Sequence, residues 1–189
     1  SCVNCTKTVG NHDIYRSPDD HFALYLDCRK NKGDWWWGGM HRGDKELMRK
    51  NSGGETRPVE RRVMATVAWA IKHYKIDPNR VYLSGNSMGG SGTLGIGLRH
   101  GGVFAAIKAN VPAGVEHAFQ RMFLSPKKTP DGVVFPDPPI CIDYSGHNDR
   151  WSDGHDLFSR AMNDRNYAFL CYWGPFGHAN NSANIKKSN

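Results

Sequence analysis

A serine lies at the centre of the pentapeptide Gly85-Asn86-Ser87-Met88-Gly89. A serine flanked at two residues on each side by glycine is typical of a sharp strand-to-helix turn, in which a strained backbone holds the hydroxyl at the apex. Glycine suits both flanking positions because the chain passes so close there that a Cβ would collide. The pattern predicts that Ser87 is a nucleophile; it does not fit a phosphate-binding loop, because no Gly-Lys-Ser/Thr follows.

A serine hydroxyl is a poor nucleophile at neutral pH, so it needs a base within hydrogen-bonding reach and an acid that orients that base. In parallel sheets, functional residues gather at the carboxyl ends of the strands. Asp149 comes just after a predicted strand at residues 140–144, and His178 just after the last predicted strand, at 167–173. Both are therefore candidates for this chemistry.

Other residues compete for these positions. Asp153 follows Asp149 by four residues and would reach the same histidine if the loop folded differently, whereas Asp143 lies inside the strand and is expected to face a buried partner or the sheet edge. His147 and His155 are in the same neighbourhood as the acid. His178 could also be a solvated loop histidine, although the preceding glycine favours a tight loop that directs the imidazole inward.

The elements that must position these residues alternate between strands and helices. A turn at 77–79 starts a strand at 80–84, and a small-residue helix follows the serine to about residue 100. A helix is predicted from Pro58 to about Tyr74, with an apolar stripe of Val63, Val67, Trp69, Ile71 and Tyr74. Further strands are predicted at 22–28 and 104–111, and a further helix at 154–163. This alternation predicts an α/β fold with a mostly parallel sheet covered by helices on both faces.

At these motifs the chain resembles the α/β-hydrolases, in particular the bacterial esterases and polyhydroxybutyrate-depolymerase-like enzymes. The matching segments are residues 76–90, Gly146-x-x-Asp149 and Gly177-His178, within a resemblance that spans about 22–180. It implies Ser87 as nucleophile, Asp149 as orienting acid and His178 as general base, with the backbone N–H of Met88 as one oxyanion donor. It further implies hydrolysis of a carboxylic ester, free or carried on a polysaccharide, through an acyl-enzyme and without a metal or organic cofactor.

One part of the family pattern is missing. The second oxyanion donor should come from the loop after the family's third strand, but the chain has no His-Gly-Gly motif, and its strand at 22–28 corresponds to the fourth. We therefore expect a single domain over 1–189 that lacks the first strands, with an irregular segment at 1–20 and a polar tail at 180–189. A segment of a larger hydrolase, a core completed by a second piece or an oligomer, and a compact cutinase-like enzyme are the open accounts.

Aromatic and small residues near the turn have two interpretations each. Trp35, Trp36 and Trp37 follow the first predicted strand and either line an acyl or sugar pocket or cover the sheet edge and a helix. Asn86, beside the serine, is a candidate substrate contact. Close packing of the helix on the sheet would explain its glycines at 92, 95 and 97.

Composition limits the remaining function classes. The 189 residues are 39% hydrophobic and suit one domain, and no apolar run approaches the roughly 18 residues of a membrane span. The net charge of +7 is spread along the chain, so we expect neither a nucleic-acid nor a membrane partner. Of five cysteines, Cys28, Cys141 and Cys171 suit the core, and Cys2 and Cys5 lack a second pair for zinc. A prolyl-oligopeptidase-like peptidase and a non-catalytic binding module are the rival functions.

Overall fold

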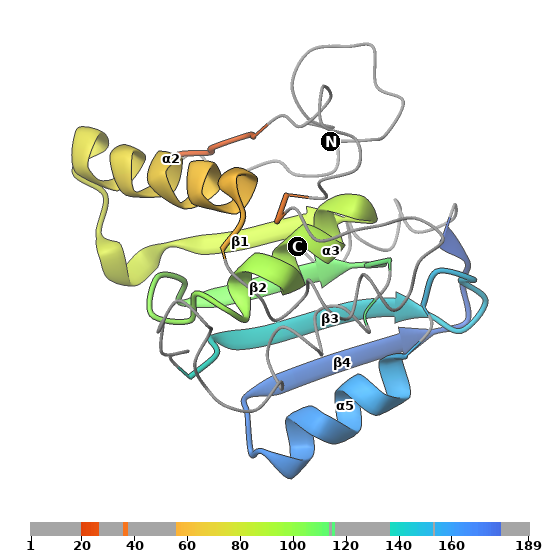
Figure 1. Cartoon of the computed structure of the whole chain (residues 1–189). Helices are drawn as coiled ribbons and strands as arrows, with labels where there is room; N and C mark the ends of the chain where they lie inside the picture. The colour runs from red at the N-terminus through yellow and green to blue at the C-terminus, as the bar shows by residue number, and fades with distance from the viewer. Residues whose placement is uncertain are drawn as a thin grey trace, which may run out of the picture.

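In the part of the chain that the structure describes, four strands form one parallel sheet in the order in which they occur along the chain (Figure 1). The computed structural model describes residues 20–26, 36–37, 56–113, 115, 137–152 and 154–178. The strands are β1 (Tyr82–Asn86), β2 (Ala106–Asn110), β3 (Ile140–Gly146) and β4 (Phe169–Gly174). Each of these strands overlaps a segment predicted as a strand. The predicted α/β class with a parallel sheet is confirmed.

Three helices share one face of this sheet: α2 (Pro58–Tyr74), α3 (Met88–Gly97) and α5 (His155–Asp164). The residues Leu83, Ile107, Cys141 and Phe169 form one row across the four strands. Val63 of α2, Leu94 of α3 and Phe158 of α5 pack into the same core cluster as this row. Right-handed crossovers that all advance in one direction place their helices on one side, as seen here for α3 and α5.

The opposite face of the sheet is open to solvent over much of the described chain. Its large apolar side chains include Tyr82 of β1, Ile140 of β3 and, 61% exposed, Leu170 of β4. Within the described residues the helices therefore cover one face, and the predicted cover of the second face is not seen there. None of the described helices is both long and apolar enough to cross a membrane.

The helix α2 has the predicted bounds, but its buried stripe differs from the predicted one. Pro58 occupies the first turn, where its missing N–H costs nothing, and Lys75 ends the helix in the left-handed conformation with φ 54°. Val59, Val63 and Val67 are buried, whereas Trp69 is 53% exposed and Tyr74 is also exposed. Two residues of helix rotate a side chain by about 200°, so Trp69 points away from the face that Val67 buries. Its indole instead stacks on His73, with 4.8 Å between ring centroids.

The predicted strand at 22–28 is not a strand over its described part. Residues 22–26 have no regular secondary structure, and Phe22 is 70% exposed. Its ring stacks on that of Tyr74, with 5.2 Å between centroids. The described part of this apolar segment therefore contacts the end of α2 and is not a strand of the sheet. Residues 1–19 of the predicted irregular segment at 1–20 lie outside the described residues, as do the tail at 180–189 and Cys2, Cys5 and Cys28.

The short helix α3 packs closely on its surroundings through three glycines. A Cβ on Gly92 would lie 2.5 Å from Cδ1 of Trp36, and one on Gly95 would lie 2.8 Å from Cδ1 of Trp37. A Cβ on Gly97 would lie 2.7 Å from Cγ2 of Ile107 on β2. Real Cβ contacts are longer, so all three positions favour glycine. The predicted close packing of the helix on the sheet is confirmed at Gly97, whereas Gly92 and Gly95 pack on the two tryptophan rings.

Candidate active site

Ser87 occupies a strained turn between β1 and α3. Its backbone has φ 55° and ψ −116°, a left-handed conformation that a residue with a side chain rarely adopts. The Ser87 N–H donates to the carbonyl of Asn110 at 2.9 Å, and its own carbonyl accepts from the N–H of Ser91 at 3.0 Å. These bonds fix the turn to the end of β2 and to the first turn of α3. The hydroxyl is therefore held at the carboxyl end of the sheet.

Only one of the two flanking glycines is required for the reason predicted. A Cβ on Gly85 would fall on the carbonyl group of Gly89 and lie 2.6 Å from Oγ1 of Thr93. A Cβ on Gly89 would meet nothing within 4 Å. The expectation of a collision at Gly89 is wrong because the close approach places the Gly89 backbone, and not its Cα–H, against Gly85.

The structure brings together the three residues predicted for chemistry. Oγ of Ser87 lies 2.6 Å from Nε2 of His178, and Nδ1 of His178 lies 2.7 Å from Oδ2 of Asp149. A carboxylate only accepts, so Nδ1 of His178 carries the proton and Nε2 is free to accept from the Ser87 hydroxyl. The Asp149 carboxyl is fully buried, and the imidazole is about one-third exposed. The arrangement can remove a proton from Ser87 and hold the resulting imidazolium beside a carboxylate.

The loops that carry Asp149 and His178 are bonded to each other. The N–H of His147 donates to the carbonyl of Gly174 at 2.9 Å, and that of Asn148 donates to the carbonyl of Phe176 at 3.2 Å. A Cβ on Gly146 would fall on the Phe176 carbonyl, so glycine is needed where the two loops meet. Because β3 and β4 are neighbours, their carboxyl-end loops extend the sheet pairing and bring acid and base into register.

The acid is held by its own turn. The Asp149 N–H donates to the Gly146 carbonyl at 3.2 Å, and the Asp149 carbonyl accepts from the Ser152 N–H at 3.0 Å. Its second carboxylate oxygen, Oδ1, accepts from the backbone N–H of Trp151 at 2.9 Å. Both oxygens of Asp149 are thus bonded, and the competing residue Asp153 lies outside the described residues.

Two of the other candidates form a separate buried cluster. Asp143 faces a buried partner, as expected: its Oδ2 lies 3.0 Å from Nε2 of His155, and its Oδ1 accepts from the Ser145 hydroxyl at 2.9 Å. His155 is therefore already paired with Asp143, whereas the ring of His147 stacks on that of Trp173 with 5.0 Å between centroids. Neither histidine contacts Ser87 in the hydrogen bonds of the described residues.

The remaining predicted site residues lie near the turn with different exposure. Met88 is buried as the first residue of α3, a position whose N–H has no partner within a helix and points along the positive end of the helix dipole. Asn86 is half-buried, and its amide oxygen is buried without a hydrogen bond. Trp36 is 7% exposed and packs on Gly92, so its burial favours the core interpretation. Trp35 lies outside the described residues.

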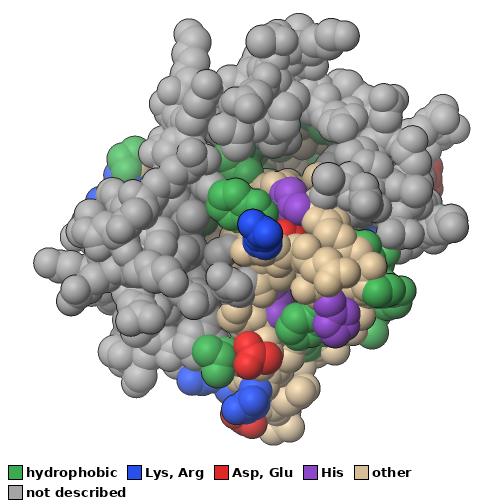
Figure 2. All heavy atoms as spheres, turned by 90° about the vertical axis from the view of Figure 1, so that its right-hand side faces the viewer, with side chains coloured by type: hydrophobic (Ala, Val, Ile, Leu, Met, Phe, Trp, Pro, Cys, Tyr) green, Lys and Arg blue, Asp and Glu red, His purple; other side chains and the backbone are tan. Residues whose placement is uncertain are grey.

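Trp151 lies near the site although it was not among the predicted site residues. Its indole is 52% exposed and its ring centroid lies 6.3 Å from that of His178. It belongs to the face at the carboxyl ends of the strands, on which histidine, basic and hydrophobic side chains gather in Figure 2. Its position two residues after the predicted acid was the only available signal.

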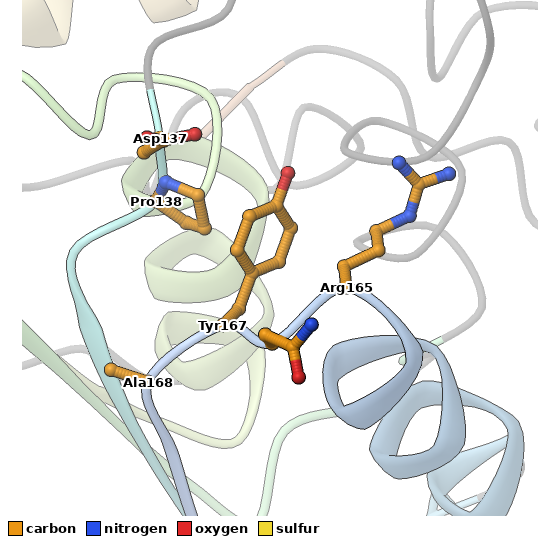
Figure 3. Close-up of a pocket in the computed structure, with 6 residues that line it drawn as sticks. Asp137, Pro138, Arg165, Tyr167 and Ala168 are labelled. Atoms are coloured by element: carbon orange, nitrogen blue, oxygen red, sulfur yellow. The ribbon is translucent and has the colours of Figure 1, made fainter.

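A cavity of about 420 Å³ lies away from Ser87 (Figure 3). Asp137 and Pro138, which precede β3, and residues 165–168, which precede β4, line it. These are the amino ends of parallel strands, opposite to the end that carries Ser87, so this cavity is not the substrate pocket of that residue. Across the described ranges, no group of three or more His, Cys, Asp or Glu side chains could hold a metal ion.

Solved structures show which fold this geometry belongs to. No family model and no curated protein matches the chain. The serine hydrolase FphF of Staphylococcus aureus, a fluorophosphonate-binding enzyme, matches over 70% of this chain and 62% of its own, with TM-score 0.55 and 16% identity. Esterase PE8 matches over 81% of this chain and 66% of its own, with TM-score 0.54 and 18% identity. The chain has the α/β-hydrolase fold.

Within the α/β-hydrolase fold the match extends to enzymes of more than one class. Dipeptidyl peptidase 4 of Porphyromonas gingivalis matches over 68% of this chain and 21% of its own, with TM-score 0.50 and 20% identity. The present chain spans less than two thirds of the length of FphF and about two thirds of that of PE8. The order Ser87, Asp149, His178 along the chain is the order in which α/β-hydrolases place nucleophile, acid and base.

Proposed function

We propose that this α/β-hydrolase domain is a serine hydrolase that cleaves carboxylic esters through an acyl-enzyme. The observation that carries the proposal is the chain of hydrogen bonds from Ser87 through His178 to Asp149, with distances of 2.6 and 2.7 Å. The strained backbone of Ser87 supports its role, because such strain persists where the surrounding structure holds a reactive group in place.

The first half of the reaction forms the acyl-enzyme. Oγ of Ser87 attacks the ester carbonyl carbon while Nε2 of His178 takes the hydroxyl proton. The negative charge moves to the carbonyl oxygen, where the backbone N–H of Met88 and the positive end of α3 stabilise it. The tetrahedral intermediate then expels the alcohol oxygen, which receives the proton from His178.

The second half regenerates the serine. Water attacks the acyl carbon and gives a proton to Nε2 of His178, and the intermediate collapses to the carboxylic acid as Ser87 regains that proton. Asp149 keeps Nδ1 of His178 protonated throughout and stabilises the imidazolium. The substrates we propose are small carboxylic esters and esters carried on polysaccharide.

A fluorophosphonate probe tests the nucleophile directly. We expect one adduct per chain, mapped to Ser87 by peptide mass analysis, and no adduct in Ser87→Ala or His178→Ala. A folded wild-type protein without an adduct would rule out an activated serine and favour a non-catalytic binding module. If the adduct forms, rates of hydrolysis of a panel of acetate esters and aminoacyl amides distinguish an esterase from a peptidase.

A further inference from the structure

Trp151 differs from the other exposed tryptophans in what its ring contacts. Trp69 stacks on His73 at an interplanar angle of 15°, and Trp173 stacks on His147 at 28°. The ring of Trp151 is tilted by 46° against His178 and has no stacked partner among the ring pairs of the described residues. Its exposed indole face is therefore available for stacking on a ring of a ligand.

The backbone of Trp151 is held by Asp149, the residue whose carboxylate also orients His178. Its backbone N–H donates to Oδ1 of Asp149, and Oδ2 of the same carboxylate bonds to His178. The Trp151 backbone and the imidazole are thus bonded to the same carboxylate, and their rings lie 6.3 Å apart.

The proposed chemistry indicates which part of the substrate would meet this ring. His178 returns its proton to the leaving oxygen, so the alcohol portion of the ester must pass beside the imidazole. The oxyanion is held elsewhere, at the start of α3. Trp151 lies beside this imidazole, so a group attached to the leaving oxygen would come within reach of its ring.

We propose that Trp151 is a stacking platform for an alcohol portion with a flat apolar ring face, either a sugar or an aryl group. This inference rests on the proposed function and names the substrate class that the site prefers. A flat indole face stacks on both kinds of ring, and such contacts add discrimination beyond simple burial. The exposure of Trp151 leaves the face accessible to a large substrate, which suits an ester attached to a carbohydrate.

Three acetate esters test the proposal: ethyl acetate, benzyl acetate and a monoacetylated methyl glucoside. In Trp151→Ala we expect kcat/KM for at least one ring-bearing ester to fall about 3- to 10-fold relative to ethyl acetate, mainly through KM. Trp151→Phe should recover part of the loss. The ester that shows the larger loss distinguishes a sugar from an aryl ring.

Trp69→Ala is the matched control, because Trp69 is as exposed as Trp151 but lies on α2. It should leave all three ratios unchanged. An equal fall for all three esters in Trp151→Ala, or no fall, would overturn the platform. Fluorophosphonate labelling separates the two proposals: a labelled wild type with unchanged ratios rejects the platform alone, whereas an unlabelled wild type rejects the serine hydrolase and the platform with it.

Discussion

The imidazole of His155 lies 3.0 Å from the carboxylate of Asp143, and neither side chain is exposed to solvent. Nδ1 of His155 faces the Ser152 carbonyl at 2.7 Å and must carry a proton. Nε2 faces Oδ2 of Asp143 and the hydroxyl oxygen of Ser145. The Ser145 hydroxyl donates to Asp143, so toward His155 its oxygen is an acceptor. Both ring nitrogens therefore face acceptors, and the imidazole is charged. Burial alone would lower the pKa of His155, but the hydrogen bond to Asp143, its charge and the Ser152 carbonyl outweigh it and raise the pKa.

We predict that His155→Gln destabilises the fold by about 3 kcal/mol, because it leaves the Asp143 carboxylate buried without its cation. A raised pKa in the folded state gives a contribution that is complete below the ordinary pKa of 6.5 and is lost as pH rises through the raised value. The difference in unfolding free energy between wild type and variant should therefore be larger at pH 5.5 than at pH 9, as measured by urea denaturation.

His147→Gln provides the control for this measurement, since His147 is exposed in the loop after β3. Its effect on the free energy of unfolding should be small. A His155→Gln difference that is equal at both pH values would show that the imidazole is not charged in the fold.

The two glycines of α3 at positions 89 and 92 should respond oppositely to alanine. Gly92→Ala forces a methyl group against the ring of Trp36 and should destabilise the protein by about 1–3 kcal/mol. Gly89→Ala meets open space within the first turn of a helix and should stabilise by up to about 1 kcal/mol. Thermal and urea unfolding of both variants measure this, and a large loss in Gly89→Ala would contradict the packing described here.

Asp149→Asn should leave the fold intact and reduce kcat by about a thousandfold or more. The Trp151 N–H still needs an acceptor, so the asparagine oxygen should occupy that side and its NH2 group should face His178. That donor forces the imidazole proton onto Nε2, which then cannot accept from Ser87. Ester hydrolysis by Asp149→Asn and by Asp153→Asn decides between the two acids: a greater loss in the second variant would reassign the role.

Cys171 should be a slow thiol although it is only partly buried. Desolvation, followed by the charge of Asp143, raises its pKa to about 11, and burial also raises the pKa of Cys141 well above its ordinary value. The thiolate is the reactive form, so alkylation of Cys171 at pH 7.5 should be about a hundredfold slower than that of an ordinary cysteine. Timed iodoacetamide labelling with peptide mass mapping measures the rate, and labelling within minutes would contradict the assignment.

Local patterns predicted those parts of the structure that local rules determine. Pro58 and the valines of α2 specify a helix, and the glycines around Ser87 specify its turn. Asp149 and His178 could be chosen because parallel strands place their following residues at one edge. The segment at 22–26 was wrongly predicted as a strand because an apolar sequence alone does not determine which element it packs against. The pairing of Asp143 with His155 and the position of Trp151 depend on how a loop returns to its strand, which spacing alone does not give.

The order of the strands has a consequence for the timing of assembly. Each strand pairs with the one made just before it, so β1, β2 and β3 can be in place while β4 is still being synthesised. Ser87 precedes its hydrogen-bond partner His178 by 91 residues, and that histidine follows β4. During synthesis Ser87 would therefore occupy its turn without the base that activates it, and its hydroxyl would be as unreactive as that of an ordinary alcohol. Its reactivity would begin only when β4 docks and brings His178 to Ser87, which makes the hydroxyl a reporter of that docking step.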